Sequence, residues 1–191
     1  ITVDATTKVQ GSVYMGGLSG GESLLQYDSA PHNFENCYNS GNIKFSGEAG
    51  LSGSGVVKMG GAFACFVDTD TYDPTLTFIN GFTNSGSVTF DGTLHSKDGI
   101  YMGGLVGQLV LDTKDLSTCS GNVVNQGAIT VAGESNGAPS YVGGMFGSFE
   151  IKANATPAAV GAKLYQLGDI IYSGSATESW VGGILAHTNT S

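Results

Sequence analysis

Residues 14–18 read Tyr-Met-Gly-Gly-Leu, and close variants of this phrase return four more times along the chain. They read Lys-Met-Gly-Gly-Ala at 58–62, Tyr-Met-Gly-Gly-Leu at 101–105, Tyr-Val-Gly-Gly-Met at 141–145 and Trp-Val-Gly-Gly-Ile at 180–184. Successive copies are 44, 43, 40 and 39 residues apart. A period of this length is typical of repeat proteins, in which each unit buries its apolar face only against its neighbours. The chain is therefore predicted to be a single repeat array over residues 1–191.

A second phrase recurs with the same period and carries an amide residue at its start. It reads Asn-Ser-Gly-Asn-Ile-Lys-Phe at 39–45, with further copies at 84–90, 125–131 and 166–172. The amide side chains form the column Asn39, Asn84, Asn125 and Gln166. Stacked amides can hydrogen-bond along an array as they do in cross-β stacks. Asparagine before glycine also suits a tight turn, so both interpretations stay open here.

Strand-forming residues dominate between the glycines, and no segment has a helical period with caps. When the units are superposed, several positions stay apolar in nearly every unit, as a stacked core requires. We therefore expect an all-β fold, a parallel β-solenoid of about five coils of ~42 residues with loop excursions. The variable segments, such as 46–56 and 91–100, are expected to be surface loops. A propeller is the main alternative, but it needs four strands per blade, and only about three strand phrases occur per unit.

The composition argues against several partners. The chain has 31 glycines, only 12% charged residues, no arginine and a net charge of -9. A chain with this acidic balance lacks the positive charge that nucleic-acid binding requires, and its binding to anionic membrane surfaces is disfavoured. No apolar run reaches the roughly 18 residues that a membrane span needs. Cys37, Cys65 and Cys119 occupy different positions in the unit, which favours buried small hydrophobes and leaves one disulfide open.

The point within the repeat unit at which the array begins and ends bears on how it assembles. Ile1-Thr2-Val3 matches the phrase at 129–131, so the array begins within a unit, and it ends shortly after the fifth double glycine. End strands with unpaired backbone groups recruit further strands. We expect a segment of a longer chain, or a filament subunit, that stacks end to end onto neighbouring repeats or subunits.

Candidate site residues are few, and none forms a catalytic constellation. The acidic residues do not recur in one column, and His32, His95 and His187 lie far apart in the repeat frame. Asp68, Asp70 and Asp73 are a candidate calcium loop, with a solvated loop tip as the alternative. Candidate glycosylation sites are Asn154 and Asn189 in two sequons and Ser29 in an Asp-Ser-Ala motif. We expect no cofactor beyond this Ca²⁺ option, and no enzymatic activity.

The residue before each Met or Val of the first phrase should point away from the core, because side chains alternate along a strand. This outward column contains Tyr14, Tyr101, Tyr141 and Trp180, interrupted by Lys58. Aromatic rings at strand spacing predict a platform on which surface glycans stack. The alternative is that the rings lie against neighbouring loops or stabilise the sheet.

The phrase Tyr-Met-Gly-Gly-Leu-Ser-Gly at 14–20, its copy at 101–107 and Asn-Cys-Tyr-Asn-Ser-Gly-Asn-Ile at 36–43 resemble the GLUG-type repeats of secreted and surface-attached proteins. The resemblance covers nearly the whole chain. It implies an extracellular β-solenoid of the kind found in adhesins and large surface proteins, and it brings no catalytic residue. The expected function is therefore structural or adhesive, as a rigid stalk or filament subunit. The alternative is a carbohydrate-binding or polysaccharide-degrading β-helix enzyme.

Overall fold

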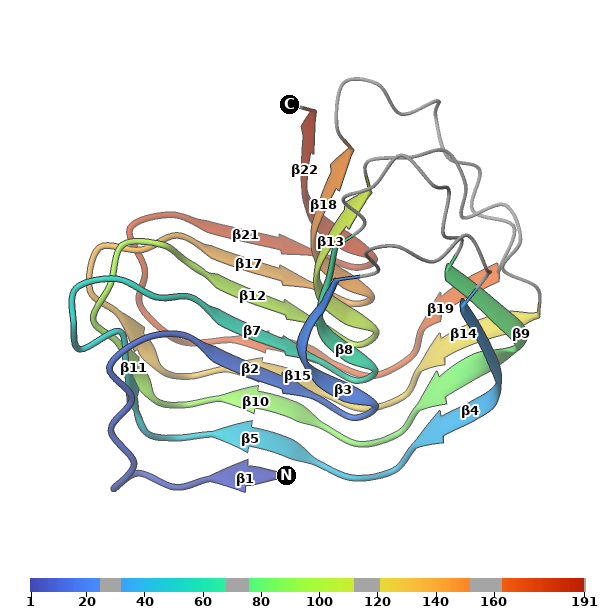
Figure 1. Ribbon diagram of the computed structural model, residues 1–191, viewed down its shortest axis with the longest axis horizontal. Coiled ribbons are helices and arrows are strands. Elements are labelled where there is room, and N and C mark those ends of the chain that lie inside the picture. The colour runs from blue at the N-terminus through green and yellow to red at the C-terminus, as the bar shows by residue number, and fades with distance from the viewer. Residues whose placement is uncertain (25–31, 68–75, 112–120, 152–162, 191) are drawn as a thin grey trace.

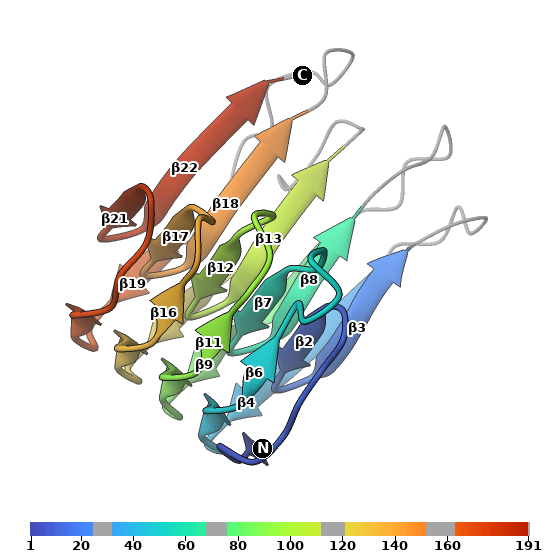
Figure 2. The same cartoon turned by 90° about the vertical axis from the view of Figure 1, so that its left-hand side faces the viewer.

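The computed structural model describes residues 1–24, 32–67, 76–111, 121–151 and 163–190. All regular elements in these ranges are β-strands, which pair in parallel into five sheets. The chain visits the sheets in one repeating order, which we call A, B, C, D and E, and then starts the next unit (Figure 1). Figure 2 shows the equivalent strands of successive units lined up in rows from the N- to the C-terminal end. The parallel β-solenoid predicted from the sequence is confirmed.

Sheets A and C lie on opposite sides of one core, and sheet B closes the end between them (Figure 1). Sheet A contains β1 Thr2–Val3, β5 Ile43–Phe45, β10 Val88–Phe90, β15 Ile129–Val131 and β20 Ile170–Tyr172. Sheet B contains β6 Glu48–Ala49, β11 Thr93–Leu94 and β16 Glu134–Ser135. Sheet C contains β2 Val13–Gly16, β7 Val57–Gly60, β12 Ile100–Gly103, β17 Ser140–Gly143 and β21 Ser179–Gly182.

Sheets D and E enclose a second core beside the first. The strands of sheet D rise steeply from the ends of the sheet C strands, and those of sheet E return toward sheet A (Figure 1). Sheet D contains β3 Ser19–Leu24, β8 Phe63–Val67, β13 Val106–Leu111, β18 Phe146–Ile151 and β22 Leu185–Thr190. Sheet E contains β4 His32–Asn39, β9 Leu76–Asn84, β14 Asn122–Asn125 and β19 Lys163–Gln166.

The strand registers reproduce the apolar columns expected from the sequence. Phe90 pairs with Phe45 on one side and with Val131 on the other. The Phe45 and Phe90 rings stack with centroids 5.9 Å apart and planes 5° apart, and both side chains are buried in the core between sheets A and C. Burial of a side chain of this size stabilises the fold by about 1.5–3 kcal/mol. Like-on-like stacking of apolar residues therefore holds the units together.

The variable segments 46–56 and 91–100 differ from the surface loops that we expected. Each contains a two-residue strand of sheet B, where Leu94 pairs with Ala49. Both side chains are fully buried against the first core. The glycine and serine content that suggested loops belongs to the tight bends around these strands, where Gly50 and Gly99 adopt positive φ angles of 68° and 122°. Glycine adopts positive φ angles readily because it has no Cβ.

The double glycines mark the turn from sheet C to sheet D, where the backbones of successive units approach each other closely. A Cβ on Gly104 would collide with the carbonyl oxygen of Gly144 in the next unit and with Cγ of Asn125. The same position in the last unit, Gly183, has nothing within 4 Å of such a Cβ. The repeat of glycine is therefore a steric requirement of stacking.

The amide column forms a continuous ladder next to these glycines. Asn39 Nδ2 donates to Asn84 Oδ1 at 2.7 Å, Asn84 Nδ2 to Asn125 Oδ1 at 2.7 Å, and Asn125 Nδ2 to Gln166 Oε1 at 2.9 Å. The same amide nitrogens also donate within their own unit, as Asn84 Nδ2 does to Gly86 O at 2.9 Å. Both interpretations of this column, the ladder and the turn, are confirmed.

Replacing Gly104 by alanine should destabilise the protein, because overpacking a tightly packed site costs about 1–3 kcal/mol. Gly183→Ala is the matched control, since the added methyl group meets open space. Urea unfolding of the protein at a concentration low enough to keep it monomeric, followed by circular dichroism, should show a lower midpoint for Gly104→Ala and an unchanged midpoint for Gly183→Ala. Equal midpoints in the two variants would contradict the steric role of the glycines.

Replacing Asn125 by leucine should also lower the unfolding midpoint. The substitution removes the donor to Gln166 Oε1 and to Gly127 O, and it removes the acceptor of Asn84 Nδ2. Each buried polar group left without a partner costs roughly 1–3 kcal/mol. Gln126→Leu, at the exposed neighbouring position, is the control. The ladder would be unimportant for stability if both leucine variants unfolded at the same urea concentration.

Candidate functional site

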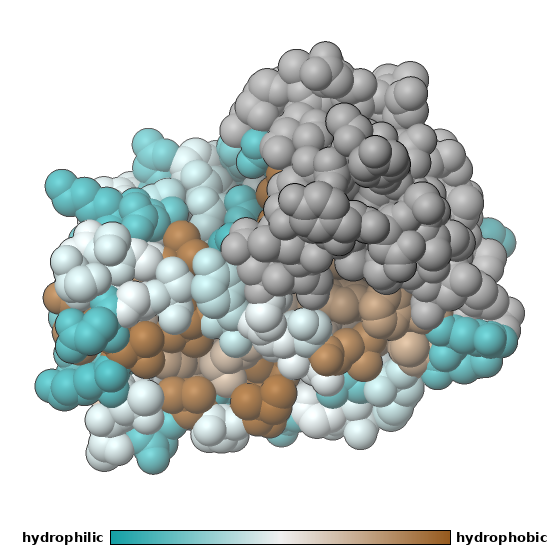
Figure 3. Space-filling view, in the orientation of Figure 1, coloured by the Kyte–Doolittle hydropathy of each residue, from teal (hydrophilic) through white to brown (hydrophobic). Residues whose placement is uncertain are grey.

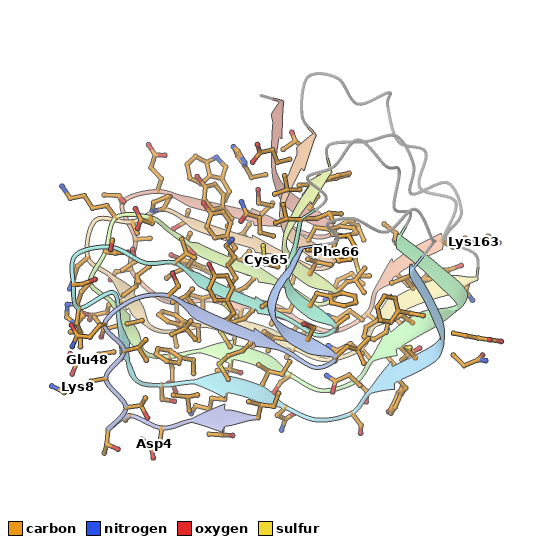
Figure 4. The ribbon with its side chains drawn as sticks, in the orientation of Figure 1. Asp4, Lys8, Glu48, Cys65, Phe66 and Lys163 are labelled. Carbon is orange, nitrogen blue, oxygen red and sulfur yellow. The ribbon has the colours of Figure 1, made fainter. Side chains whose placement is uncertain are left out.

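The most distinctive surface of the described residues is the corner where the outer face of sheet C meets sheet D. The outward column of sheet C forms one wall. The facing wall carries Cys65 and Val67 on β8 and Val110 on β13, which form a small buried cluster against Tyr14. Figure 4 shows Cys65 on the sheet C side of β8, with Phe66 on the opposite side toward the second core. We call this region the C–D corner.

Three aromatic rings stack along the sheet C wall. The centroids of Tyr101 and Tyr141 lie 4.9 Å apart with planes at 17°. Those of Tyr141 and Trp180 lie 4.8 Å apart at 10°. All three side chains are half-buried. The rings follow the strand spacing because the strands are in register, with Tyr141 paired to Tyr101 and to Trp180.

His187 lies across the corner from the C-terminal part of this column. It occupies the same register position on sheet D as Ser148 and, further along, Gln108 and Cys65. Its ring centroid is 4.9 Å from that of Tyr141 and 5.7 Å from that of Trp180, with planes tilted by 52° and 62°. The C-terminal part of the corner is therefore lined by aromatic rings and one imidazole.

Lys58 interrupts the aromatic column and points into the corner. Only 7% of this residue is exposed. Its Nζ lies 5.2 Å from the centroid of the Tyr14 ring, within the range of a cation–π interaction. The same atom donates a hydrogen bond to Cys65 Sγ at 3.2 Å, and the Cys65 thiol donates a weak hydrogen bond to Gln108 Oε1 at 4.0 Å. A buried amine, a thiol and an aromatic face thus meet at the N-terminal part of the corner.

Burial in the corner shifts the acid–base behaviour of two tyrosines. Burial raises the pKa of the Tyr101 phenol to about 12, and the neighbouring Tyr141, Asp98, Glu150 and Cys65 raise it further because like charges oppose ionisation. Burial is also the main cause that raises the pKa of Tyr141, with Glu178 adding to it. Both phenols stay protonated at neutral pH, so they act in the corner as neutral hydrogen-bonding groups.

The expected glycan-stacking residues are brought together, but with a different geometry from an open platform. The rings of Tyr101, Tyr141 and Trp180 stack on one another, so each covers part of its neighbour's face. Tyr141 and Trp180 also contact His187 of sheet D, and Tyr14 packs against the Lys58 amine. Glycan binding by this column stays a prediction, now limited to ring edges, hydroxyl groups and the outer face of Trp180.

Most of the other expected site residues lie outside the described part of the chain. This holds for the calcium candidates Asp68, Asp70 and Asp73 and for the glycosylation candidates Asn154 and Ser29. Asn189 lies in β22, where its backbone pairs with Glu150. Among the described residues, no group of three histidine, cysteine or acidic side chains is placed to hold a metal ion. The described residues also contain no helix long and apolar enough to cross a membrane.

Sequence reasoning missed the Lys58–Cys65 pair and the contact of His187 with the aromatic column. The first pair had a signal, because Lys58 replaces an aromatic residue in its column and Cys65 follows it by seven residues across the double glycine. The missing information was the angle between sheets C and D.

No protein-family model, curated protein or solved structure matches the chain.

The raised pKa of Tyr101 predicts how the protein responds to alkali. An unfolded tyrosine ionises near pH 10, whereas Tyr101 in the fold keeps its proton to about pH 12. The folded state therefore binds more protons between these values, and its stability falls as the pH rises through this window. Tyr101→Phe should remove a phenol that ionises above pH 11 in a spectrophotometric titration, and it should make unfolding less sensitive to pH between 10 and 12. A titration that loses one tyrosine near pH 10 instead would contradict the burial of this phenol.

Proposed function

We propose that the chain is a structural module of an extracellular surface protein, a rigid β-solenoid that extends a stalk or filament by end-to-end contacts. The proposal rests on a difference in exposure: apolar side chains that are buried in the earlier units are exposed in the last unit. Val142 is fully buried in the core, whereas its equivalent Val181 is 50% exposed. Likewise Met145 is fully buried, whereas Ile184 is 36% exposed. The contacts that join successive units are thus left open on the last unit.

The N-terminal unit offers a surface of the matching kind. Ile1 and Leu18 are exposed there, and Figure 3 shows hydrophobic side chains, in brown, in the lower half of the view where β1 and β2 lie. These residues belong to the same apolar columns as Ile170 and Ile184 at the other end. A further unit or subunit that continues the register would therefore place apolar residues on apolar residues, as inside the array.

The amide ladder gives the two ends a matching polarity. Each amide nitrogen donates toward the C-terminal unit, so the ladder begins with the side-chain oxygen of Asn39 and ends with the nitrogen of Gln166. Gln166 Nε2 donates to Gly168 O at 2.7 Å, and its second hydrogen has no partner among the described residues. Head-to-tail stacking would extend the ladder, whereas head-to-head stacking would place oxygens against oxygens.

The resemblance to GLUG-type repeats supports the extracellular setting, and the scarcity of charge supports a structural role. The charged contacts of the described residues are few and lie at the surface, such as Lys44 with Asp91 at 2.8 Å and Lys8 with Glu48 at 3.4 Å. Such exposed pairs contribute little to stability. The stacked cores and backbone ladders remain as the main source of rigidity, which suits a spacer.

The proposal predicts concentration-dependent association that two substitutions at the open end should block. In the earlier units, a Cβ at the second glycine meets the carbonyl of the next unit, so Gly183→Ala should obstruct an incoming unit without lowering monomer stability. Val181→Asp should do the same by placing a carboxylate in an apolar junction. Gln126→Asp, at an exposed position in the middle of the array with neutral residues at the equivalent positions of the adjacent units, is the matched control.

Sedimentation velocity of the full chain at increasing concentration, with electron microscopy of the larger species, measures this association. We expect end-to-end oligomers for the wild-type protein and for Gln126→Asp, and monomers for the other two variants. Monomers at every concentration, or oligomers that both end variants still form, would contradict the proposal. Turnover of a polysaccharide that a single carboxylate substitution abolishes would favour the enzymatic alternative instead.

A further inference from the structure

We propose that Lys58 and Cys65 form an oxidation-dependent covalent cross-link between sheets C and D. This proposal is independent of end-to-end assembly. It rests on a juxtaposition within one unit, in which β7 and β8 place an amine and a thiol opposite each other across the double glycine. Lys58 Nζ is 3.2 Å from Cys65 Sγ, and both side chains are buried.

The burial of Lys58 makes this contact unusual. Taking an ammonium group out of water is costly unless an anion or several hydrogen-bond acceptors replace the water. The partners that the structure gives the Lys58 amine are the sulfur of Cys65 and the face of the Tyr14 ring. A thiolate is the form of cysteine that best compensates a neighbouring ammonium, and it is also the nucleophilic form. The two groups are therefore placed for a reaction between the sulfur and the amine.

The other lysines in the described ranges lack this arrangement. Lys8 and Lys44 reach acidic side chains at the surface, and Lys97 and Lys163 are exposed. Lys58 is the one buried lysine among them. The equivalent position is tyrosine or tryptophan in the other four units. Packing within the aromatic column therefore does not explain a lysine at position 58.

The reaction needs a small peroxide as the oxidant, and its atoms and charges balance. The Cys65 thiolate attacks one oxygen of hydrogen peroxide, so an S–O bond forms as the O–O bond breaks and a sulfenic acid results. The hydroxide that is released takes a proton from the Lys58 ammonium and becomes water. The Lys58 amine then attacks the sulfur, an S–N bond forms, the S–O bond breaks, and the hydroxyl group leaves as a second water with one amine hydrogen.

The net reaction converts one thiolate, one ammonium and one peroxide into one sulfenamide and two waters. The sulfur loses two electrons and the peroxide gains them. Sulfenic acids are known to condense with nitrogen in this way, and the amine of Lys58 already lies beside the sulfur that it must attack. The product carries no charge, so the cross-link leaves no ionisable amine or thiol at these two positions. Burial of Cys65 favours a water-sized oxidant over a bulky disulfide.

Mass spectrometry of the full chain after peroxide treatment tests the cross-link. A disulfide would also remove two hydrogens, so the experiment uses Cys37→Ser/Cys119→Ser, in which Cys65 is the only thiol left. After oxidation and quenching, we expect a product lighter by two hydrogen atoms. Trypsin should no longer cleave after Lys58, because the lysine is modified, so residues 45–97 should appear as one peptide with the same mass loss. Treatment with dithiothreitol should restore cleavage at Lys58.

Two further variants in the same background make the result specific. Lys58→Arg keeps the positive charge but supplies no comparable nucleophilic amine, and Cys65→Ser removes the sulfur; neither should lose two hydrogens. The loop that the bond closes is short, so we expect only a small change in the unfolding midpoint. Normal cleavage after Lys58, with Cys65 unchanged or carrying only added oxygen, would overturn the proposal.

Discussion

The structure depends on one constraint, the in-register stacking of parallel strands about 4.8 Å apart. Every side chain then has its own equivalents as nearest neighbours in the units on either side. Residue types that pack well against themselves are therefore favoured at each position, and Phe45 on Phe90 and Asn84 on Asn125 follow this rule in the core and the ladder. Where the backbone of one unit presses against the next, as at Gly104, the equivalent residue must have no side chain at all.

This regularity decides what the sequence could predict. A column is visible in the sequence because its members share a chemical type and a fixed spacing, so the apolar columns, the amide ladder and the parallel solenoid were all accessible. The two-residue strands of sheet B were not, because strands such as Thr93–Leu94 are too short to show a period among glycines and serines. Their burial depends on how the chain bends between sheets A and C, which no local pattern records.

The C–D corner shows the same limit for function. The alternation of side chains correctly placed Tyr101 and Trp180 away from the first core, but it carried no information about what lies on that side. The steep angle of sheet D turns an expected open platform into a half-buried corner (Figure 1). Contacts across the corner, such as Lys58 with Cys65, join columns from different sheets. Comparing equivalent positions within one column therefore does not reveal these contacts.

The low charge of the chain follows from the same stacking rule. Two like charges on adjacent strands repel by roughly 3 kcal/mol near a protein surface. A charged residue is therefore tolerated when its column neighbours are neutral, as Lys44 is between Thr2 and Thr89 in sheet A. Any unit that docks on an open end meets the same restriction, since it becomes the next member of every column. Opposite charges from different columns can pair, as Lys44 does with Asp91 at 2.8 Å, whereas like charges within one column repel each other from unit to unit.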